Sequence, residues 1–264
     1  MLNSKTYKNL VLVYQMGKVG STSIEEGIKE LGINVQHIHS LKKPVMIDQF
    51  KDLKSLDYYF SKKDKLVYKF KYNFLFKNLL KTFNKRIKII SIVREPIGRN
   101  IGMFFQGIHF PIFEINRTYN NRSENAINFS ILNQMFLDKF NHRFGVDWFD
   151  NEFKQTIGVD VYKYPFNKSK GFEIITTKQY EIMIIKMEKI NELEVEINNF
   201  LDRDSFKLNK VNSGYNKWYS DLYSRFKSEF NPSEEYINEL YDSDYMRHFY
   251  TNDEIDNFKN YWLR

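Results

Sequence analysis

The sequence predicts an α/β protein with an open, mainly parallel sheet flanked by helices. Residues 9–15 and 87–93 are near-continuous apolar runs of strand length, as expected for strands buried on both faces of a parallel sheet. Each run is followed at once by a polar turn containing glycine or proline and then by a helical pattern. Strands that alternate with helices favour this architecture, and its ligand site should lie at the carboxyl ends of the strands.

The length and residue types fit one domain over residues 1–264. The chain has no cysteine, which excludes a disulfide framework and a thiolate metal site and fits a reducing compartment. A secretory leader is not recognisable, and no segment reaches the roughly 18 apolar residues of a membrane span. We therefore expect a cytoplasmic protein without an integral membrane segment.

The charge balance favours an anionic partner. A formal net charge of +7 suits a nucleotide, a nucleic acid or an acidic polysaccharide equally well. Lysine is scattered among acidic residues and no run of five or six like charges occurs, so we do not expect a nucleic-acid partner.

The N-terminal part reads as a strand-loop-helix-strand unit. The strand at 9–15 leads into the loop QMGKVGSTS, and Ser21 or Thr22 can cap a helix that ends near Gly32. The segment INVQHIHS at 33–40 is the second strand of this unit. We then expect a short helix from Pro44.

The rest of the chain continues the alternation of strands and helices. We expect a strand over 66–72, a helix over 74–83, the buried strand 87–93 and a helix that begins at Pro96. Further predictions follow in chain order: helices within 124–156, two strands in 172–187 with a turn near 177–179, one long amphipathic helix over 188–201, and helices over 216–226, 233–241 and 252–262.

The loop of residues 15–23 has the features of a phosphate-binding loop. Two glycines allow backbone N–H groups to turn inward, and the helix N-terminus adds partial positive charge. Hydroxyl groups at 21–23 and the ammonium of Lys18 complete the set of donors. The alternative is an ordinary strand-helix turn rich in small residues.

This loop differs from that of nucleoside triphosphatases. Their lysine directly precedes the terminal serine or threonine, whereas Lys18 lies three residues before Ser21. The strand 87–93 ends in arginine and not in the aspartate that would hold magnesium. These differences favour a group transfer that needs no metal.

The segment YQMGKVGSTSI resembles the 5′-phosphosulfate loop of the sulfotransferase superfamily, whose fold is related to the phosphate-loop nucleoside triphosphatases. The resemblance implies the donor 3′-phosphoadenosine 5′-phosphosulfate (PAPS) and the product 3′-phosphoadenosine 5′-phosphate (PAP), without a metal. It places Lys18 against the 5′-phosphate and the bridging oxygen. The phosphate would also be held by hydroxyl and N–H groups of the loop, at Gly17, Val19, Gly20, Ser21, Thr22 and Ser23.

The segment SIVREPIGRNIGMFFQ resembles the 3′-phosphate motif of the same superfamily through Arg94, Pro96 and Arg99. An arginine at the carboxyl end of a strand can donate charge-assisted hydrogen bonds to a phosphate. Gly102 departs from the pattern, because it stands where the family has a serine, and Ser91 is one residue that could compensate. The alternative for Arg94 and Glu95 is a surface ion pair.

The segment NSGYNKWYS resembles the NKWYS family of bacterial capsular polysaccharide synthesis proteins, which is related to sulfotransferases. Ser213 and Gly214 indicate a loop, and Lys217 is a positive charge at a helix start, where an anion would balance it. This adds Lys217 to the donor-binding residues. Trp218 and Tyr219 could equally anchor a core helix.

Sulfonate transfer to a hydroxyl needs a base, and two histidines are the best candidates. His37 and His39 lie two apart in a strand and so share one face, with His39 nearer the carboxyl end. Sulfotransferases of the heparan 2-O type are similar in this region. His109 and Glu95 are the next candidates, whereas His142 and His248 are predicted to be structural.

The sequence therefore predicts a PAPS-dependent carbohydrate sulfotransferase with Lys18, His37 and His39 as catalytic residues. Its acceptor would be a hydroxyl of a capsular polysaccharide or its precursor, with peripheral association with the capsule assembly machinery. Two alternatives stay open: a magnesium-dependent kinase of the phosphate-loop class, and a non-catalytic nucleotide-binding subunit of a capsule assembly complex.

Overall fold

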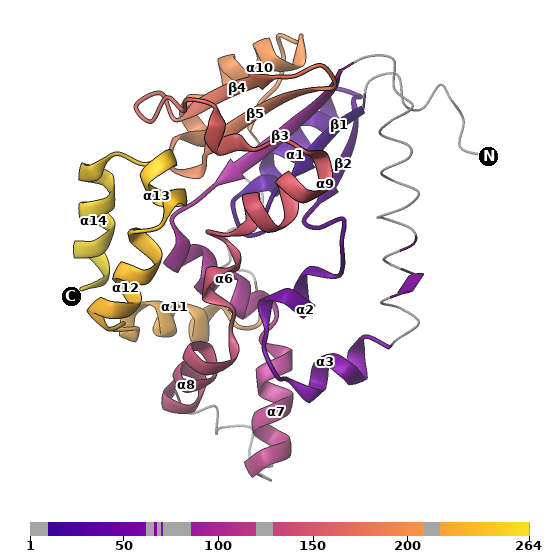
Figure 1. Ribbon diagram of the computed structural model, residues 1–264. Helices are drawn as coiled ribbons and strands as arrows, with labels where there is room; N and C mark the ends of the chain where they lie inside the picture. The colour runs from indigo at the N-terminus through magenta and orange to yellow at the C-terminus, as the bar shows by residue number, and fades with distance from the viewer. Residues whose placement is uncertain are drawn as a thin grey trace.

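A five-stranded sheet forms the centre of the protein, with strand order β2-β1-β3-β5-β4 (Figure 1). The structure is a computed structural model that describes residues 10–61, 66–67, 70, 86–119, 129–208 and 217–263. Adjacent strands are parallel except for β4, which runs antiparallel to β5 at the edge of the sheet. The predicted open, mainly parallel sheet is confirmed. The strands are β1 Leu10–Tyr14, β2 Asn34–Ile38, β3 Ile87–Val93, β4 Phe172–Thr176 and β5 Tyr180–Lys186.

The three central strands are almost fully buried, which explains their continuous apolar sequences. Every residue of β1 is buried, and β3 and β5 each have a single half-buried position, the second of the strand. β1 pairs with β2 on one side and with β3 on the other, so the carboxyl ends of these strands lie at one edge of the sheet. The loop after β1, the residues after β2 and the turn after β3 are therefore brought together there.

Helices cover both faces of the sheet and extend beyond its carboxyl edge (Figure 1). The strand-to-helix order of the first part is as predicted, with α1 after β1 and α6 after β3. The helices of this part are α1 Ser21–Glu30, α2 Val45–Gln49, α3 Lys54–Tyr59, α6 Pro96–Gln106 and α7 His109–Tyr119. Those of the second part are α8 Phe129–Lys139, α9 Gln155–Ile157, α10 Glu194–Leu201, α11 Ser220–Glu229, α12 Glu234–Tyr241, α13 Asp244–Phe249 and α14 Asn252–Trp262.

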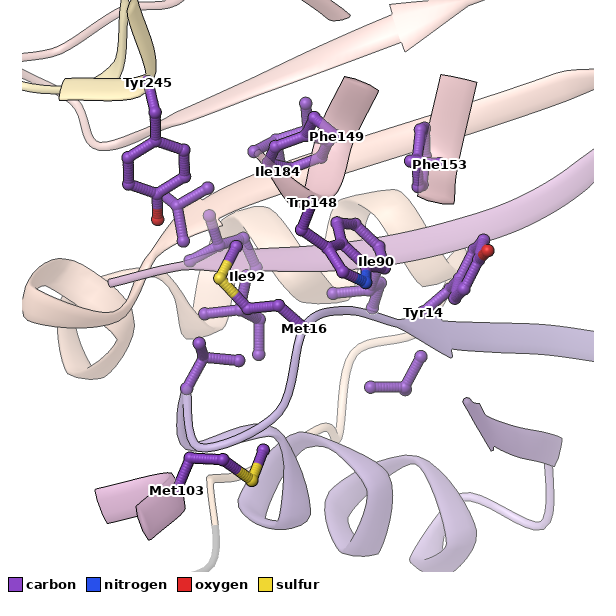
Figure 2. Packing of buried hydrophobic residues seen from close by; sticks show 14 of the residues in the cluster. Tyr14, Met16, Ile90, Ile92, Met103, Trp148, Phe149, Phe153, Ile184 and Tyr245 are labelled. Carbon is purple, nitrogen blue, oxygen red and sulfur yellow. The ribbon is translucent and has the colours of Figure 1, made fainter. Parts of the chain in front are cut away.

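An aromatic layer packs on one face of the sheet (Figure 2). Tyr14 at the end of β1 contacts Trp148 edge-on at 5.1 Å between ring centroids and stacks on Phe153 at 5.4 Å. Its hydroxyl donates to Glu152 Oε1 at 2.5 Å, and the same carboxylate accepts from Ser40 and the backbone of Leu41. The strand end that leads into the loop is thus fixed by both apolar packing and buried hydrogen bonds.

The predicted long helix over 188–201 is wrong, because a 3-10 helix over Met187–Glu192 precedes α10. The apolar residues explain the error. Ile190 and Leu193 are three apart, which fits the three-residue turn of a 3-10 helix, whereas Leu193, Ile197 and Leu201 are four apart. Two helical geometries in succession give nearly the same apolar pattern as one α-helix.

Other element predictions had mixed outcomes. The helices expected within 124–156 appear as α8, a 3-10 turn at 142–144, a π-helix over Phe149–Lys154 and α9. The two strands and the turn at 177–179 are confirmed as β4 and β5. Of the expected strand 66–72, only residues 66, 67 and 70 are described, and none of these is in a strand. The expected helix over 74–83 lies outside the described residues.

Candidate anion-binding site

The loop between β1 and α1 has an unusual backbone. Three of its residues have left-handed φ angles, 87° at Gly17, 61° at Lys18 and 77° at Gly20. The positive φ of Gly17 favours glycine, and a Cβ atom there would also lie 2.5 Å from the terminal methyl of Met103, which would have to shift. Gly20 is the residue before α1, which begins at Ser21 without a side-chain cap. The predicted capping by Ser21 or Thr22 is therefore wrong.

The loop offers several free backbone donors. Gly17 N–H donates to the side-chain oxygen of Gln15. Within the described residues, the N–H groups of Lys18, Val19 and Gly20 have no hydrogen-bond acceptor. Successive unpaired N–H groups next to a helix N-terminus form a ready anion site.

Two arginines hold the carbonyl side of this loop. Arg99 donates to Met16 O at 2.8 Å and to Gly17 O at 3.3 Å, and Arg94 Nη1 donates to Lys18 O at 2.9 Å. In a trans peptide the carbonyl and the next N–H point in opposite directions. These bonds therefore turn the N–H groups of Lys18 and Val19 away from the arginine side chains.

A cavity of about 380 Å³ opens beside the loop. Its wall combines cationic, imidazole, hydroxyl and aromatic groups, and none of its lining residues is acidic. Most of the predicted site residues lie here, from four separate parts of the chain. The lining residues are Lys18, Gly20, Ser21, Thr22, His37, His39, Arg94, Gly102, Phe105, Gln106, Met187, Lys217, Tyr219 and Tyr223.

The positive charges of this cavity are not balanced by the protein. Burial, followed by the charges of Arg94 and Lys217, lowers the pKa of Lys18 below its ordinary value. Among the described residues, none of the three cations forms an ion pair with a carboxylate. A bound anion would relieve this repulsion, because opposite charge favours the protonated amine.

Arg99 occupies a different place from the one predicted for it. Its side chain is completely buried and does not line the cavity. Besides the two loop carbonyls, it donates to Gln49 Oε1 at 2.9 Å and Asn100 Oδ1 at 3.0 Å. Burial lowers the pKa of Arg99 to about 9, which still leaves the group charged at neutral pH. Direct contact with a 3′-phosphate does not fit this geometry, so we assign Arg99 to shaping the loop.

Three other predicted loop residues also lie off the cavity wall. Gly17, Val19 and Ser23 do not line the cavity, and the side chain of Val19 is fully buried. Ser23 N–H donates to Gly20 O at 3.3 Å within the first turn of α1. These residues set the course of the loop, and Val19 adds a free N–H group.

Hydrogen bonds with α6 and with two tyrosines near the C-terminus fix the turn after β3, which carries Arg94. Glu95 is not paired with Arg94; its carboxylate caps α6 by accepting from the N–H groups of Ile97 and Gly98. The hydroxyl of Tyr241 donates to Glu95 Oε2 at 2.7 Å, and that of Tyr245 bonds both the N–H and the carbonyl of Arg94 at 2.9 Å. Glu95 is therefore a structural group and a poor base candidate.

Gly102 lines the cavity, whereas Ser91 does not. An added Cβ at Gly102 would lie 3.3 Å from Lys18 Cε and 3.9 Å from Arg94 Nη1, so a serine there would face the cations. Ser91 is buried within β3, and its hydroxyl has no partner among the described residues. It does not replace the missing serine.

The two strand histidines meet at the cavity as predicted. Their rings lie 4.7 Å apart, and both approach the side-chain nitrogen of Gln15, His37 Nε2 at 2.8 Å and His39 Nδ1 at 3.0 Å. Burial, followed by the charge of His37, lowers the pKa of His39 to about 4. His39 is therefore neutral at physiological pH. Gln15 is a residue that the sequence analysis missed as an organising group.

The C-terminal motif contributes one cation and an aromatic wall. Lys217 lies just before α11, and Tyr219 and Tyr223 pack against Phe105 at 5.8 and 5.3 Å between ring centroids. Trp218 is 71% exposed and does not anchor the core. Tyr219 and Tyr223 are four apart at the start of a helix, a spacing that could have indicated their shared face. Ser213, Gly214 and Asn216 lie outside the described residues.

Fold and cavity together define an α/β protein with a cationic cavity at the carboxyl ends of its parallel strands. A family model described as "putative capsular polysaccharide synthesis protein", named NKWYS, matches residues 120–251, half of the chain, and the chain therefore belongs to this family. The predicted capsular family is confirmed. No curated protein and no solved structure matches the chain. Within the described residues, no helix has the length and apolarity that crossing a membrane requires.

Proposed function

We propose that the protein transfers a sulfonate group from PAPS to a hydroxyl of a capsular polysaccharide or its precursor. The observation that carries this proposal is the convergence of Lys18, Arg94 and Lys217 in one cavity, beside two histidines. Such a cavity offers donors to two phosphate groups of one nucleotide, and its volume falls within the roughly 300–1,000 Å³ of small-molecule sites.

The aromatic wall supports a nucleotide or sugar ligand. Phe105, Tyr219 and Tyr223 lie at the side of the cavity next to Lys217, where a planar base or a sugar face could pack. The membership in a capsular polysaccharide family supports a glycan as the acceptor.

The proposed reaction divides its tasks among the lining residues. The acceptor oxygen bonds to sulfur while the bond from sulfur to the bridging phosphate oxygen breaks, and PAP leaves. Lys18 stabilises the charge that develops on the departing phosphate, and Arg94 holds the 3′-phosphate of the donor. A neutral histidine of the pair takes the acceptor proton, for which His37 and His39 are both placed.

Titration with PAP in the presence of EDTA tests this proposal. At 100 times its dissociation constant, a ligand bound only by the folded state adds about 2.7 kcal/mol, which raises Tm by roughly 5–10 °C. Lys18→Met and Arg94→Met should each weaken PAP binding by at least about 10-fold. Lys178→Met is the matched control, because Lys178 is exposed in the turn at the amino end of β5, opposite the site.

The same titration separates the rival functions. A melt that saturating PAP does not move would overturn the proposal, and binding of ATP only with magnesium would favour the kinase. PAP binding without release of PAP from PAPS on any glycan would favour the non-catalytic subunit.

A further inference from the structure

A carboxylate on α1 lies directly behind one of the site histidines. His37 Nδ1 is 2.6 Å from Glu25 Oε2, and both side chains are only 18% exposed. Partial burial raises the pKa of Glu25, but hydrogen bonds from Lys29 and His37 outweigh it, so that the pKa is lowered. Glu25 is therefore ionised at neutral pH and can only accept a hydrogen bond. The proton of a neutral His37 must then be on Nδ1.

The other ring nitrogen of His37 faces the loop. Nε2 lies 2.9 Å from Ser21 Oγ and 2.8 Å from the side-chain nitrogen of Gln15. Because the side-chain oxygen of Gln15 accepts from Gly17 N–H, its nitrogen must be the atom that donates to Ser21 Oγ at 2.7 Å. The hydroxyl hydrogen of Ser21 is then free to point to His37 Nε2.

We propose that Glu25 is a positioning residue, which fixes His37 as the base of the site. In this arrangement Ser21 Oγ accepts the proton of the reacting hydroxyl while its own proton moves to His37 Nε2. The O–H bond of the reacting hydroxyl and the original O–H bond of Ser21 break, while a new Ser21 O–H bond and a His37 Nε2–H bond form. Glu25 stabilises the resulting imidazolium. The inference rests on the proposed function for the reaction, but the geometry of His37 can be tested without it.

His39 is a weaker candidate for the same reason. Among the residues that the structure describes, no carboxylate lies behind its ring; its Nδ1 lies 3.0 Å from the side-chain nitrogen of Gln15 and 3.3 Å from the backbone oxygen of the same residue. The polar groups that face His37 are Glu25 and Ser21 from α1, Gln15 from the loop and His39 from the end of the same strand. Lys29 does not face His37, because it is paired with the other carboxylate oxygen of Glu25.

The first test is the ¹⁵N NMR spectrum of the histidine rings, which needs no turnover. Wild type should show His37 with hydrogen on Nδ1, and Glu25→Leu, which leaves no acceptor for this hydrogen, should lose this single tautomer. Lys29→Met is the matched control, because it removes the other partner of Glu25 and leaves His37 untouched. A wild-type His37 with hydrogen on Nε2, or an unchanged tautomer in Glu25→Leu, would overturn the inference.

The second test is the release of PAP from PAPS with water as the acceptor hydroxyl. Glu25→Gln should lower its rate by about 10- to 10³-fold while PAP affinity stays within about twofold of wild type. Equal rates in both proteins would refute the positioning role even if the enzyme is a sulfotransferase. If wild type releases no PAP with water or with any glycan as the acceptor, the proposed function fails, and the NMR result still decides whether Glu25 orients His37.

Discussion

Replacing the buried arginine of α6 should destabilise the fold, although the sequence pattern presents it as a ligand contact. Arg99 donates to four acceptors, the carbonyls of Met16 and Gly17 and the side-chain oxygens of Gln49 and Asn100. Each buried acceptor left without a donor costs about 1–3 kcal/mol, and loss of the buried charge returns part of that sum. We therefore expect Arg99→Met to lose about 3–5 kcal/mol of unfolding free energy.

Arg94 provides the contrast, because it lines the cavity and makes a single hydrogen bond to the loop, from Nη1 to Lys18 O. Arg94→Met should cost about 1 kcal/mol or less and remove most of the preference for PAP over adenosine 5′-phosphate. Urea unfolding measures the first quantity, and calorimetric titration of both nucleotides measures the second. If Arg99→Met unfolds within about 1 kcal/mol of wild type but loses the 3′-phosphate preference, Arg99 is a ligand contact and our assignment is refuted.

Three further predictions concern the loop, the cavity wall and a buried histidine. Gly17→Ala should lose about 1–2 kcal/mol more unfolding free energy than Gly32→Ala. Both glycines have a positive φ, but only a Cβ at position 17 would contact Met103. Equal losses in urea unfolding would contradict this prediction. Gly102→Ser should bind PAP several-fold more tightly than Gly102→Ala in calorimetry, because its hydroxyl faces the cations; equal affinities would place the 3′-phosphate elsewhere. Burial lowers the pKa of His142 to about 4, so the stability that the neutral imidazole provides is complete above pH 6.5 and is lost as the pH falls toward 4. Between pH 7 and pH 4, the unfolding free energy of wild type should fall by about 3 kcal/mol more than that of His142→Gln. Parallel losses in the two proteins would show that His142 keeps an ordinary pKa.

Local sequence patterns were sufficient to predict the strands, the loop and the turn that surround the site. The strand before the loop, the loop glycines and the arginine at the end of β3 each follow from short-range rules on burial, turns and helix starts. Lys18, Arg94 and Lys217 were all predicted donor-binding residues, and the structure brings them to one cavity.

The remaining features depend on partners far apart in the chain. Glu25 on α1 contacts His37 on β2. Arg99 donates to two carbonyl groups that lie 82 and 83 positions before it in the chain. The presence of an arginine in the sequence does not show whether it binds a phosphate or supports a loop from a buried position, because both roles use the five donors of the guanidinium. One local signal was available: Ser21 and Glu25 are four apart and so share a helix face.

The tyrosines that hold the β3–α6 turn determine when the cationic cavity can form during synthesis. The loop and both arginines leave the ribosome well before Tyr241 and Tyr245, which bond Glu95 and the backbone of Arg94. A nascent chain that has folded only its first part would carry the cationic groups without the supports that orient one of them. Anion affinity should therefore arise late, when α12 and α13 have docked, so that an unfinished chain binds anions weakly.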